Sequence, residues 1–235
     1  MKNNGLTLGV LGGMGPAATA EFQRLLALKA PADCDQEHPR MIVYSHTATP
    51  DRTTYLLGKG PDPEAFLLDG LQTLVRWGAD RLAVTCNTAH FFVDRFIEKG
   101  LLPVPVIHII DETIRSCRER SAQGAWLTAT LGTMNTGIYQ RHAESCGYRF
   151  RIPDEAVREE IHDITDQVKA GMQQEAAVRY RAVIERLWET EHLPVVGACT
   201  ELPVAYQLTG LPQESFVSSL EALADGCIRE LYKEL

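Results

Sequence analysis

The 235-residue chain has no apolar run that approaches the roughly 18 residues of a membrane-spanning helix. Its first apolar stretch, residues 6–11, is short, contains a glycine and leads directly into a glycine-rich turn, which is not the pattern of a signal peptide. We therefore expect a cytoplasmic protein. In that compartment the six cysteines are expected to be mostly free thiols.

Zinc motifs and a surplus of basic residues are also missing. There is no Cys-x-x-Cys motif and no spacing of Cys and His that supports zinc, so we expect no structural metal. Lys and Arg number 23 against 31 Asp and Glu, which gives a formal net charge of −8. This balance argues against nucleic-acid and anionic-membrane partners, because both bind basic surfaces. An acidic small molecule stays open, since a pocket sets its own local field.

The sequence does contain an alternation of short apolar runs with longer stretches of helical periodicity. Strands are predicted over 6–11, 41–46, 81–85, 104–109, 125–131 and 195–198. Helices are predicted over 16–29, 63–78, 91–99, 110–120, 136–146, 155–171, 175–189 and 214–235. This order indicates an α/β fold with parallel sheets built from βαβ units.

A faint internal repeat predicts two similar lobes. Leu11-Gly-Gly-Met14 and Leu131-Gly-Thr-Met134 each precede a helix, and one cysteine motif follows each of them at a similar distance. We expect two Rossmann-like, pseudo-symmetric lobes, and the chain is long enough for each to have a core. The first is predicted over residues 1–110, joined by a C-terminal helix in 211–235, and the second over 111–210.

Gly12-Gly-Met-Gly15 is predicted to form the turn between the first strand and a helix that Pro16 begins. Such a turn directs backbone N–H groups and the positive end of a helix at an anion. The turn also fits a relaxed dinucleotide fingerprint, so a nicotinamide-dependent dehydrogenase is one alternative. Against it, the second strand ends in Val43-Tyr-Ser-His46 without the acidic residue that binds a ribose. A purely structural tight turn is the remaining interpretation.

Two of the six cysteines, Cys86 and Cys199, follow strand-like runs, and the ends of such strands are where α/β sheets bind ligands. Both have polar neighbours that are costly to bury without a function or a partner: Asn87, Thr88, Thr200 and Glu201. The other cysteines lie in helical or loop contexts that favour ordinary packing: Cys34, Cys117, Cys146 and Cys227. One thiol in each half suggests one acid–base group for each face of a substrate, as a cofactor-independent racemase requires.

Three nearby residues have both a functional and an ordinary interpretation. His90, four residues after Cys86, is expected to orient or pack rather than to act as a base. Arg52 can clamp a carboxylate through two parallel hydrogen bonds, or can form a surface ion pair with Asp51. Lys169 is typical of a solvated lysine at a helix end. The hydroxyl-rich segment 130–137 would suit a second carboxylate.

Taken together and in order, these motifs resemble those of the aspartate/glutamate racemase family, and of aspartate racemases in particular. They are Gly12-Gly-Met-Gly15, Pro50-Asp-Arg52, Cys86-Asn-Thr-Ala-His90, Leu131-Gly-Thr-x-x-Thr136 and Gly197-Ala-Cys-Thr-Glu201. The resemblance covers nearly the whole chain, and the two cysteine motifs are its specific part. It implies an active site between two α/β lobes, no pyridoxal phosphate or other cofactor, and a cysteine on each side of the amino acid.

The resemblance also implies residue roles. Cys86 and Cys199 are the expected catalytic thiols, and Arg52 and Lys169 match basic residues that hold the side-chain carboxylate in aspartate racemases. The expected substrate-binding residues are Met14, Gly15, Arg52, Asn87, Thr88, Thr133, Asn135, Thr136, Lys169, Thr200 and Glu201. The expected partners are a small acidic amino acid, aspartate before glutamate, and a second copy in a homodimer. A hydantoin racemase, a maleate isomerase and a non-catalytic protein that binds acidic amino acids stay open.

Overall fold

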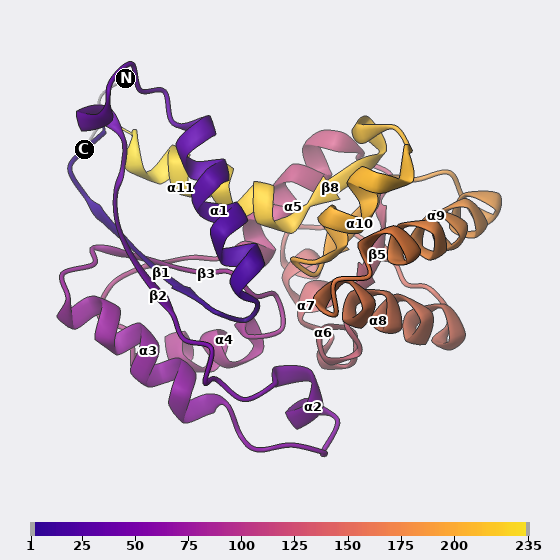
Figure 1. Cartoon of the computed structure of the whole chain (residues 1–235), viewed down its shortest axis with the longest axis horizontal. Coiled ribbons are helices and arrows are strands. Elements are labelled where there is room, and N and C mark those ends of the chain that lie inside the picture. Colours follow the sequence, from indigo (N-terminus) through magenta and orange to yellow (C-terminus); the bar gives the residue numbers. More distant parts are fainter. Residues whose placement is uncertain (1–2, 234–235) are drawn as a thin grey trace. The chain divides into compact units, whose positions relative to one another are not determined.

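The computed structural model describes residues 3–233, and the chain divides into two units (Figure 1). The first unit runs to Glu112 and is completed by the chain from Leu220 onward, and the second is Thr113–Ser219. Each unit contains one four-stranded parallel sheet. The expected α/β fold with two parallel sheets is therefore confirmed. Within residues 3–233, no helix is both long enough and apolar enough to cross a membrane.

The sheet of the first unit has the strand order β2-β1-β3-β4. Its strands are β1 (Thr7–Gly12), β2 (Arg40–Ser45), β3 (Arg81–Val84) and β4 (Val106–Ile107). β1 is buried along almost its whole length, while the edge strand β2 is partly exposed. This explains why β1 is a continuous apolar run: a central parallel strand is covered on both faces.

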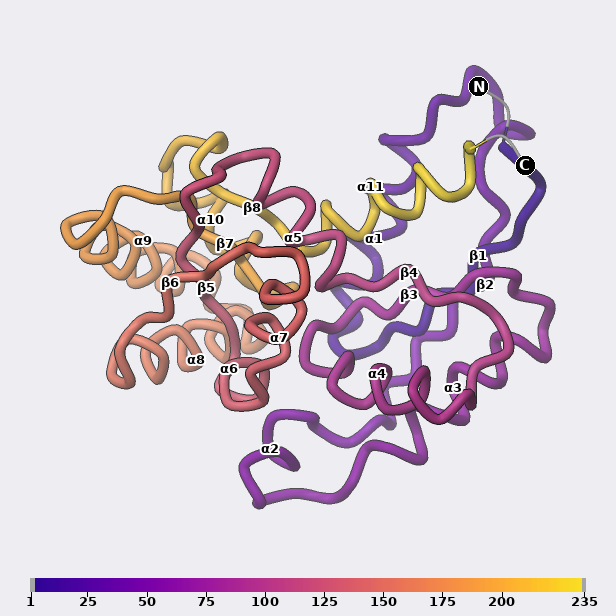
Figure 2. Tube along the Cα trace, turned by 180° about the vertical axis from the view of Figure 1, so that it is seen from behind, coloured from indigo at the N-terminus to yellow at the C-terminus, as the bar shows by residue number. Residues whose placement is uncertain are grey.

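Helices cover both faces of the first sheet (Figures 1 and 2). α1 (Pro16–Lys29) and α11 (Ser219–Leu231) lie over one face, where Lys29 pairs with Asp225 at 2.8 Å. α3 (Glu64–Arg76) and α4 (His90–Glu98) lie over the other. A short helix, α2 (Arg52–Leu56), and a 3₁₀ turn at Asp35–Glu37 lie in the connections.

The two ends of the described chain meet in the first unit, as Figure 2 shows. The Asn4 N–H donates to the Leu231 carbonyl at 2.9 Å, and the Tyr232 hydroxyl donates to the Glu37 carbonyl at 2.7 Å. The end of the last helix is therefore bonded to the first residues of the described chain, within the first unit.

The sheet of the second unit has the order β6-β5-β7-β8. Its strands are β5 (Ala125–Ala129), β6 (Phe150–Arg151), β7 (Val195–Ala198) and β8 (Phe216–Ser218). Its helices are α5 (Ile109–Arg120, which begins in the first unit), α6 (Leu131–Thr136), α7 (Ile138–Ser145), α8 (Glu155–Lys169), α9 (Gln173–Thr190) and α10 (Leu202–Thr209). α8, α9 and α10 pack on one another around a buried core that includes Tyr180 and Tyr206. Numbered by appearance within each unit, both sheets have the order 2-1-3-4.

Several predicted boundaries are wrong. The last helix begins at Ser219 rather than at 214, because 213–215 form a 3₁₀ turn and β8 pairs with β7. The segment 211–219 therefore belongs to the second unit. The predicted helix over 136–146 corresponds to α7, which begins only at Ile138. Gly137 separates α7 from α6, and its φ of +64° favours glycine. β6, β8, α2, α6 and α10 were not predicted.

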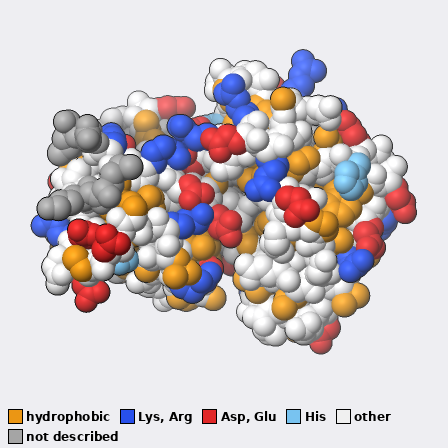
Figure 3. All heavy atoms as spheres, turned by 90° about the horizontal axis from the view of Figure 1, so that it is seen from above, with side chains coloured by type: hydrophobic (Ala, Val, Ile, Leu, Met, Phe, Trp, Pro, Cys, Tyr) orange, Lys and Arg blue, Asp and Glu red, His pale blue; other side chains and the backbone are white. Residues whose placement is uncertain are grey.

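The face drawn in Figure 3 carries charged side chains of both signs. On the face drawn in Figure 3, lysine and arginine side chains alternate with acidic ones rather than gathering into a single basic area.

Candidate active site

Cys86 lies at the carboxyl edge of the first sheet, two residues beyond β3. β1 and β3 are parallel with Leu11 opposite Val84, and the Thr85 N–H donates to the Leu11 carbonyl at 3.1 Å. The turn after β1 therefore lies beside the segment that carries Cys86. Cys86 is only 6% exposed, and Asn87 is buried as well. Thr88, the third polar residue of the motif, is also buried.

The glycine turn after β1 packs tightly against its neighbours. Gly13 has a φ of +86°, and a Cβ there would lie 2.6 Å from the backbone nitrogen of His46 at the end of β2. The Gly13 N–H donates to the Thr19 hydroxyl at 2.9 Å, and that hydroxyl lies 3.2 Å from the Thr85 hydroxyl. The positive φ and this close approach explain the glycine, and its N–H is already bonded within the protein.

Arg52, at the start of α2, has a guanidinium group held by backbone carbonyls. Its Nη1 donates to Pro50 at 3.0 Å and its Nη2 to Met14 at 3.1 Å. Asp51 instead caps α2, accepting from the Thr54 N–H at 2.7 Å and from its hydroxyl. Within the described residues Arg52 forms no ion pair, so its charge is not neutralised by a carboxylate. The surface ion pair with Asp51 is therefore not formed, and the guanidinium instead joins Arg52 to the Met14 carbonyl.

His90 is completely buried, and its Nδ1 donates to the Cys86 carbonyl at 2.8 Å. Burial, reinforced by the neighbouring His108, lowers the pKa of His90 to about 3. The imidazole is therefore neutral near pH 7. This suits an orienting group and does not suit a base that must accept a proton.

Cys199 lies at the corresponding edge of the second sheet, directly after β7. β5 and β7 are parallel with Ala129 opposite Ala198, so the beginning of the segment after β5 lies beside Cys199. Cys199 is 7% exposed, and its thiol donates to Oε2 of Glu201 at 3.0 Å. The Thr200 hydroxyl donates to the same oxygen at 3.1 Å. A buried carboxylate therefore accepts a hydrogen bond from the Cys199 thiol and favours its protonated form.

The charges around Cys199 oppose one another. Burial raises the pKa of the Cys199 thiol, Glu201 raises it further, and Lys169 lowers it. For Lys169, burial alone would lower the pKa, but negative charges at Cys199 and Glu201 raise it overall. Lys169 also pairs with Asp166 at 3.1 Å. Lys169, which the sequence presents as an ordinary helix-end lysine, is therefore part of the electrostatic environment of Cys199.

The hydroxyl-rich segment 130–137, which follows β5, contains the short helix α6. Thr130 caps it by accepting from the Thr133 N–H at 3.3 Å, and Thr133 is buried. The Thr136 hydroxyl donates to the Thr133 carbonyl at 2.8 Å, and Asn135 is exposed. α6 packs against α8, the helix that carries Lys169.

The predicted site residues are divided between the two units. The first contains Met14, Gly15, Arg52, Cys86, Asn87 and Thr88, and the second contains Thr133, Asn135, Thr136, Lys169, Cys199, Thr200 and Glu201. Sequence reasoning missed the thiol–carboxylate contact, although the spacing Cys-x-Glu could have indicated it. It also missed Asp166, whose position three residues before Lys169 favours a helical ion pair.

Comparison with known proteins identifies the family of the chain. The family model described as Asp/Glu/Hydantoin racemase matches residues 11–226. A Bacillus subtilis protein named broad specificity amino-acid racemase RacX is 28% identical over 210 residues, which cover 83% of this chain and 85% of that protein. The structure of Picrophilus torridus aspartate racemase has a TM-score of 0.82 and 27% identity, covering 98% of this chain and 96% of its own. A putative Asp/Glu racemase from Yersinia pestis, 22% identical, shares the fold with a TM-score of 0.76 and coverage of 97% and 100%.

Proposed function

The chain belongs to the Asp/Glu/hydantoin racemase family, and from this membership we propose that it racemises an acidic amino acid, aspartate first, with Cys86 and Cys199 as its two acid–base groups. The enzyme class, an amino-acid racemase, agrees with the resemblance found in the motifs. The choice of substrate and the division of work between the thiols are the parts that we propose.

The observation that carries this proposal is the equivalent position of the two cysteines. Each follows the third strand of a four-stranded parallel sheet, and the two sheets have the same strand order. Each is buried beside the segment that follows the first strand of its own sheet. Two repeats of one structural unit therefore supply one thiol each, and a two-base racemisation needs two such groups.

In the proposed reaction a thiolate removes the α-hydrogen as a proton and becomes a thiol. The electron pair of the broken C–H bond stays on the α-carbon and delocalises into the carboxylate. The thiol on the other side donates its proton to that carbon and becomes a thiolate. The enantiomer is formed, and the two sulfur atoms have exchanged protonation states.

The thiols alone do not account for the required rate. One positioned acid or base contributes about 10²–10⁴-fold, roughly 3–5 kcal/mol. Typical enzymes lower barriers by at least about 8 kcal/mol, so other groups must stabilise the carbanion. Donors aimed at the α-carboxylate can do so as charge moves onto it. The buried polar groups beside the cysteines supply candidates: Asn87, Thr88, Thr133 and Thr200.

Two cations support an acidic substrate. Arg52 has no carboxylate partner among the described residues. Lys169 pairs with Asp166 near the end of its helix and lies in the electrostatic field of Cys199 and Glu201. A guanidinium and an ammonium together suit the side-chain carboxylate of aspartate. The Glu201 carboxylate would repel that group, so it suits the substrate ammonium or the thiol proton.

Circular dichroism of L-aspartate incubated with the reduced protein tests the proposal directly. Loss of optical activity, faster for aspartate than for glutamate, alanine and serine, is the expected result. A broad profile would match the breadth that the name of the Bacillus subtilis relative implies, and would refute the preference for acidic side chains. Binding of aspartate without loss of chirality would refute the racemase and favour a binding protein.

A further inference from the structure

His90 uses both ring nitrogens within the protein. Its Nδ1 bonds to the Cys86 carbonyl at 2.8 Å, and the Ile109 N–H donates to its Nε2 at 3.4 Å. A carbonyl oxygen only accepts, so the hydrogen is on Nδ1, and Nε2 carries the lone pair. These two bonds fix one tautomer of a neutral imidazole.

The local backbone explains why the Cys86 carbonyl needs a side-chain donor. In a regular α-helix this carbonyl would accept from the N–H of residue 90. Here the His90 N–H bonds to the Asn87 carbonyl at 3.0 Å, in a tight turn that precedes α4. The His90 ring takes over the bond that its backbone does not make.

The same ring joins two neighbouring strand ends. Cys86 follows β3, and Ile109 begins α5 just after β4, which pairs with β3. The first N–H groups of a helix have no partner within it, and Nε2 provides one for Ile109. The ring therefore holds the Cys86 segment against an element that is fixed by the sheet.

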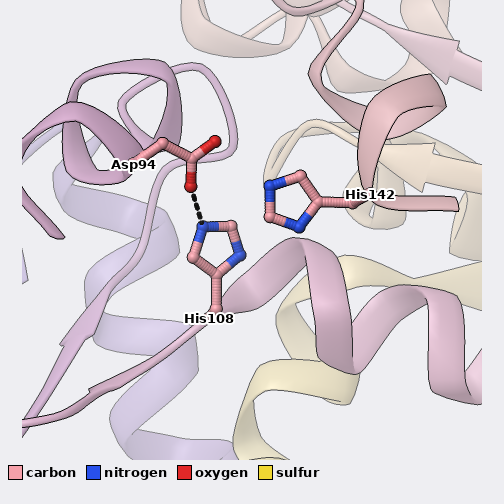
Figure 4. A group of neighbouring side chains, drawn as sticks. All are labelled: Asp94, His108 and His142. Carbon is pink, nitrogen blue, oxygen red and sulfur yellow. Dashed lines mark hydrogen bonds and ion pairs between the residues drawn. The ribbon is translucent and has the colours of Figure 1, made fainter. Parts of the chain in front are cut away.

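A second histidine supports the ring of His90. His108 lies edge-on to it, with ring centroids 4.4 Å apart. The His108 Nε2 bonds to Asp94 Oδ1 at 3.0 Å, as Figure 4 shows, and Asp94 is one helical turn beyond His90 on α4. The position of His90 is thus set by packing as well as by its own hydrogen bonds.

We propose that His90 is a positioning residue that sets the placement of the Cys86 thiol by binding its backbone carbonyl, and that it takes no proton from the substrate. The proposal rests on the proposed function, because it presumes a catalytic Cys86. Its role is to keep the thiol within the narrow range of positions from which it can reach the α-carbon.

Two substitutions separate the bond from the bulk of the ring. His90→Asn places its amide N–H near the position of Nδ1 and can keep the bond to Cys86. His90→Gln places the amide one carbon further out and loses that bond. We expect kcat/KM to stay within about threefold of the native value in His90→Asn and to fall about 10–100-fold in His90→Gln, as misplacement of a reacting group by an ångström does. The pH profile of kcat should not change shape in either variant.

A readout independent of turnover is the alkylation of Cys86 by iodoacetamide, followed by mass spectrometry. Loss of one buried hydrogen bond should raise the rate about fivefold in His90→Gln and leave it nearly unchanged in His90→Asn. Cys199 in the same samples serves as the internal control. His192→Asn is the matched control, because His192 packs against Trp188 in the second unit and should leave Cys86 unaffected.

Equal kcat/KM and equal Cys86 alkylation in His90→Asn and His90→Gln would overturn the proposal. If the native protein has no racemase activity, the proposed function fails, while the alkylation rates still decide the role of His90. Should neither variant fold, nitrogen NMR of the native protein decides: an Nδ1–H tautomer that does not titrate between pH 5 and 8 supports the proposal. An Nε2–H tautomer, or a titration in that range, refutes it.

Discussion

Replacing Glu201 and replacing Lys169 should shift the pKa of Cys199 in opposite directions. Glu201→Gln removes a negative charge but keeps an oxygen that can accept from the thiol. Because Glu201 raises the pKa of Cys199, the variant should titrate at a lower pH. Lys169→Met removes a positive charge that lowers this pKa, so that variant should titrate at a higher pH.

The magnitude follows from the distances and the exposure of each group. A charge within about 4–6 Å typically moves a pKa by 1–3 units, and the thiol of Cys199 lies 3.0 Å from the Glu201 carboxylate in a buried site. We expect a fall of about 1–3 units in Glu201→Gln. The Lys169 side chain is 39% exposed, and solvent screens its charge, so the rise in Lys169→Met should be smaller.

The assay is the pH dependence of alkylation of each cysteine, resolved by mass spectrometry. A thiolate loses nucleophilicity as its pKa falls, so the rate at a fixed pH below the pKa should rise only about threefold for each unit. The midpoint of the titration is therefore the better measure. The exposed Cys34 is the internal control and should not change. A midpoint that rises in Glu201→Gln, or falls in Lys169→Met, would show that the electrostatic account of Cys199 is wrong.

The remaining predictions concern substrate, catalysis and stability. Lys169→Met should raise KM for aspartate about 10–100-fold, the worth of one charge-assisted contact, whereas Lys99→Met on the surface should not; unchanged kinetics would remove Lys169 from the site. Cys86→Ala and Cys199→Ala should each abolish racemisation but exchange the α-hydrogen of opposite enantiomers in D₂O, and racemisation by either variant would exclude the two-thiol mechanism. Burial raises the pKa of Cys227, so its contribution to stability is complete below the unfolded thiol pKa near 8.5 and is lost as the pH rises toward the folded value. The free energy of unfolding, measured with urea, should therefore fall above pH 8.5 by about 1.4 kcal/mol per pH unit because of this thiol. Cys227→Ala should reduce that slope.

The alternation of strands and helices could be predicted from the sequence because central parallel strands are continuous apolar runs. The strands that were missed, Phe150–Arg151 and Phe216–Ser218, have two and three residues, too few to show a pattern. Their extended form is set by pairing with β5 and β7 at the edges of the second sheet. The helix Leu202–Thr209 was missed because it is short and follows directly from the cysteine motif.

The same contrast holds for the candidate site, in which some features could be predicted from the sequence and others could not. Strand ends are visible in a sequence, so the positions of Cys86 and Cys199 could be inferred. The neighbours that tune them could not, because they depend on side-chain geometry after packing. The carbonyls that hold Arg52 come from residues 14 and 50, and only the fold brings these together.

The two thiols are held by different means although their strands are equivalent. Cys199 has a carboxylate within hydrogen-bond distance and a lysine in its field, whereas the segment of Cys86 is held by a neutral histidine. Enantiomers have equal free energy, so kcat/KM must be the same in both directions of a racemisation. A substitution that slows proton transfer at one thiol therefore lowers kcat/KM equally for both enantiomers. The difference between the two environments must be sought in kcat and KM separately for each enantiomer, and in the rate at which each α-hydrogen exchanges with solvent.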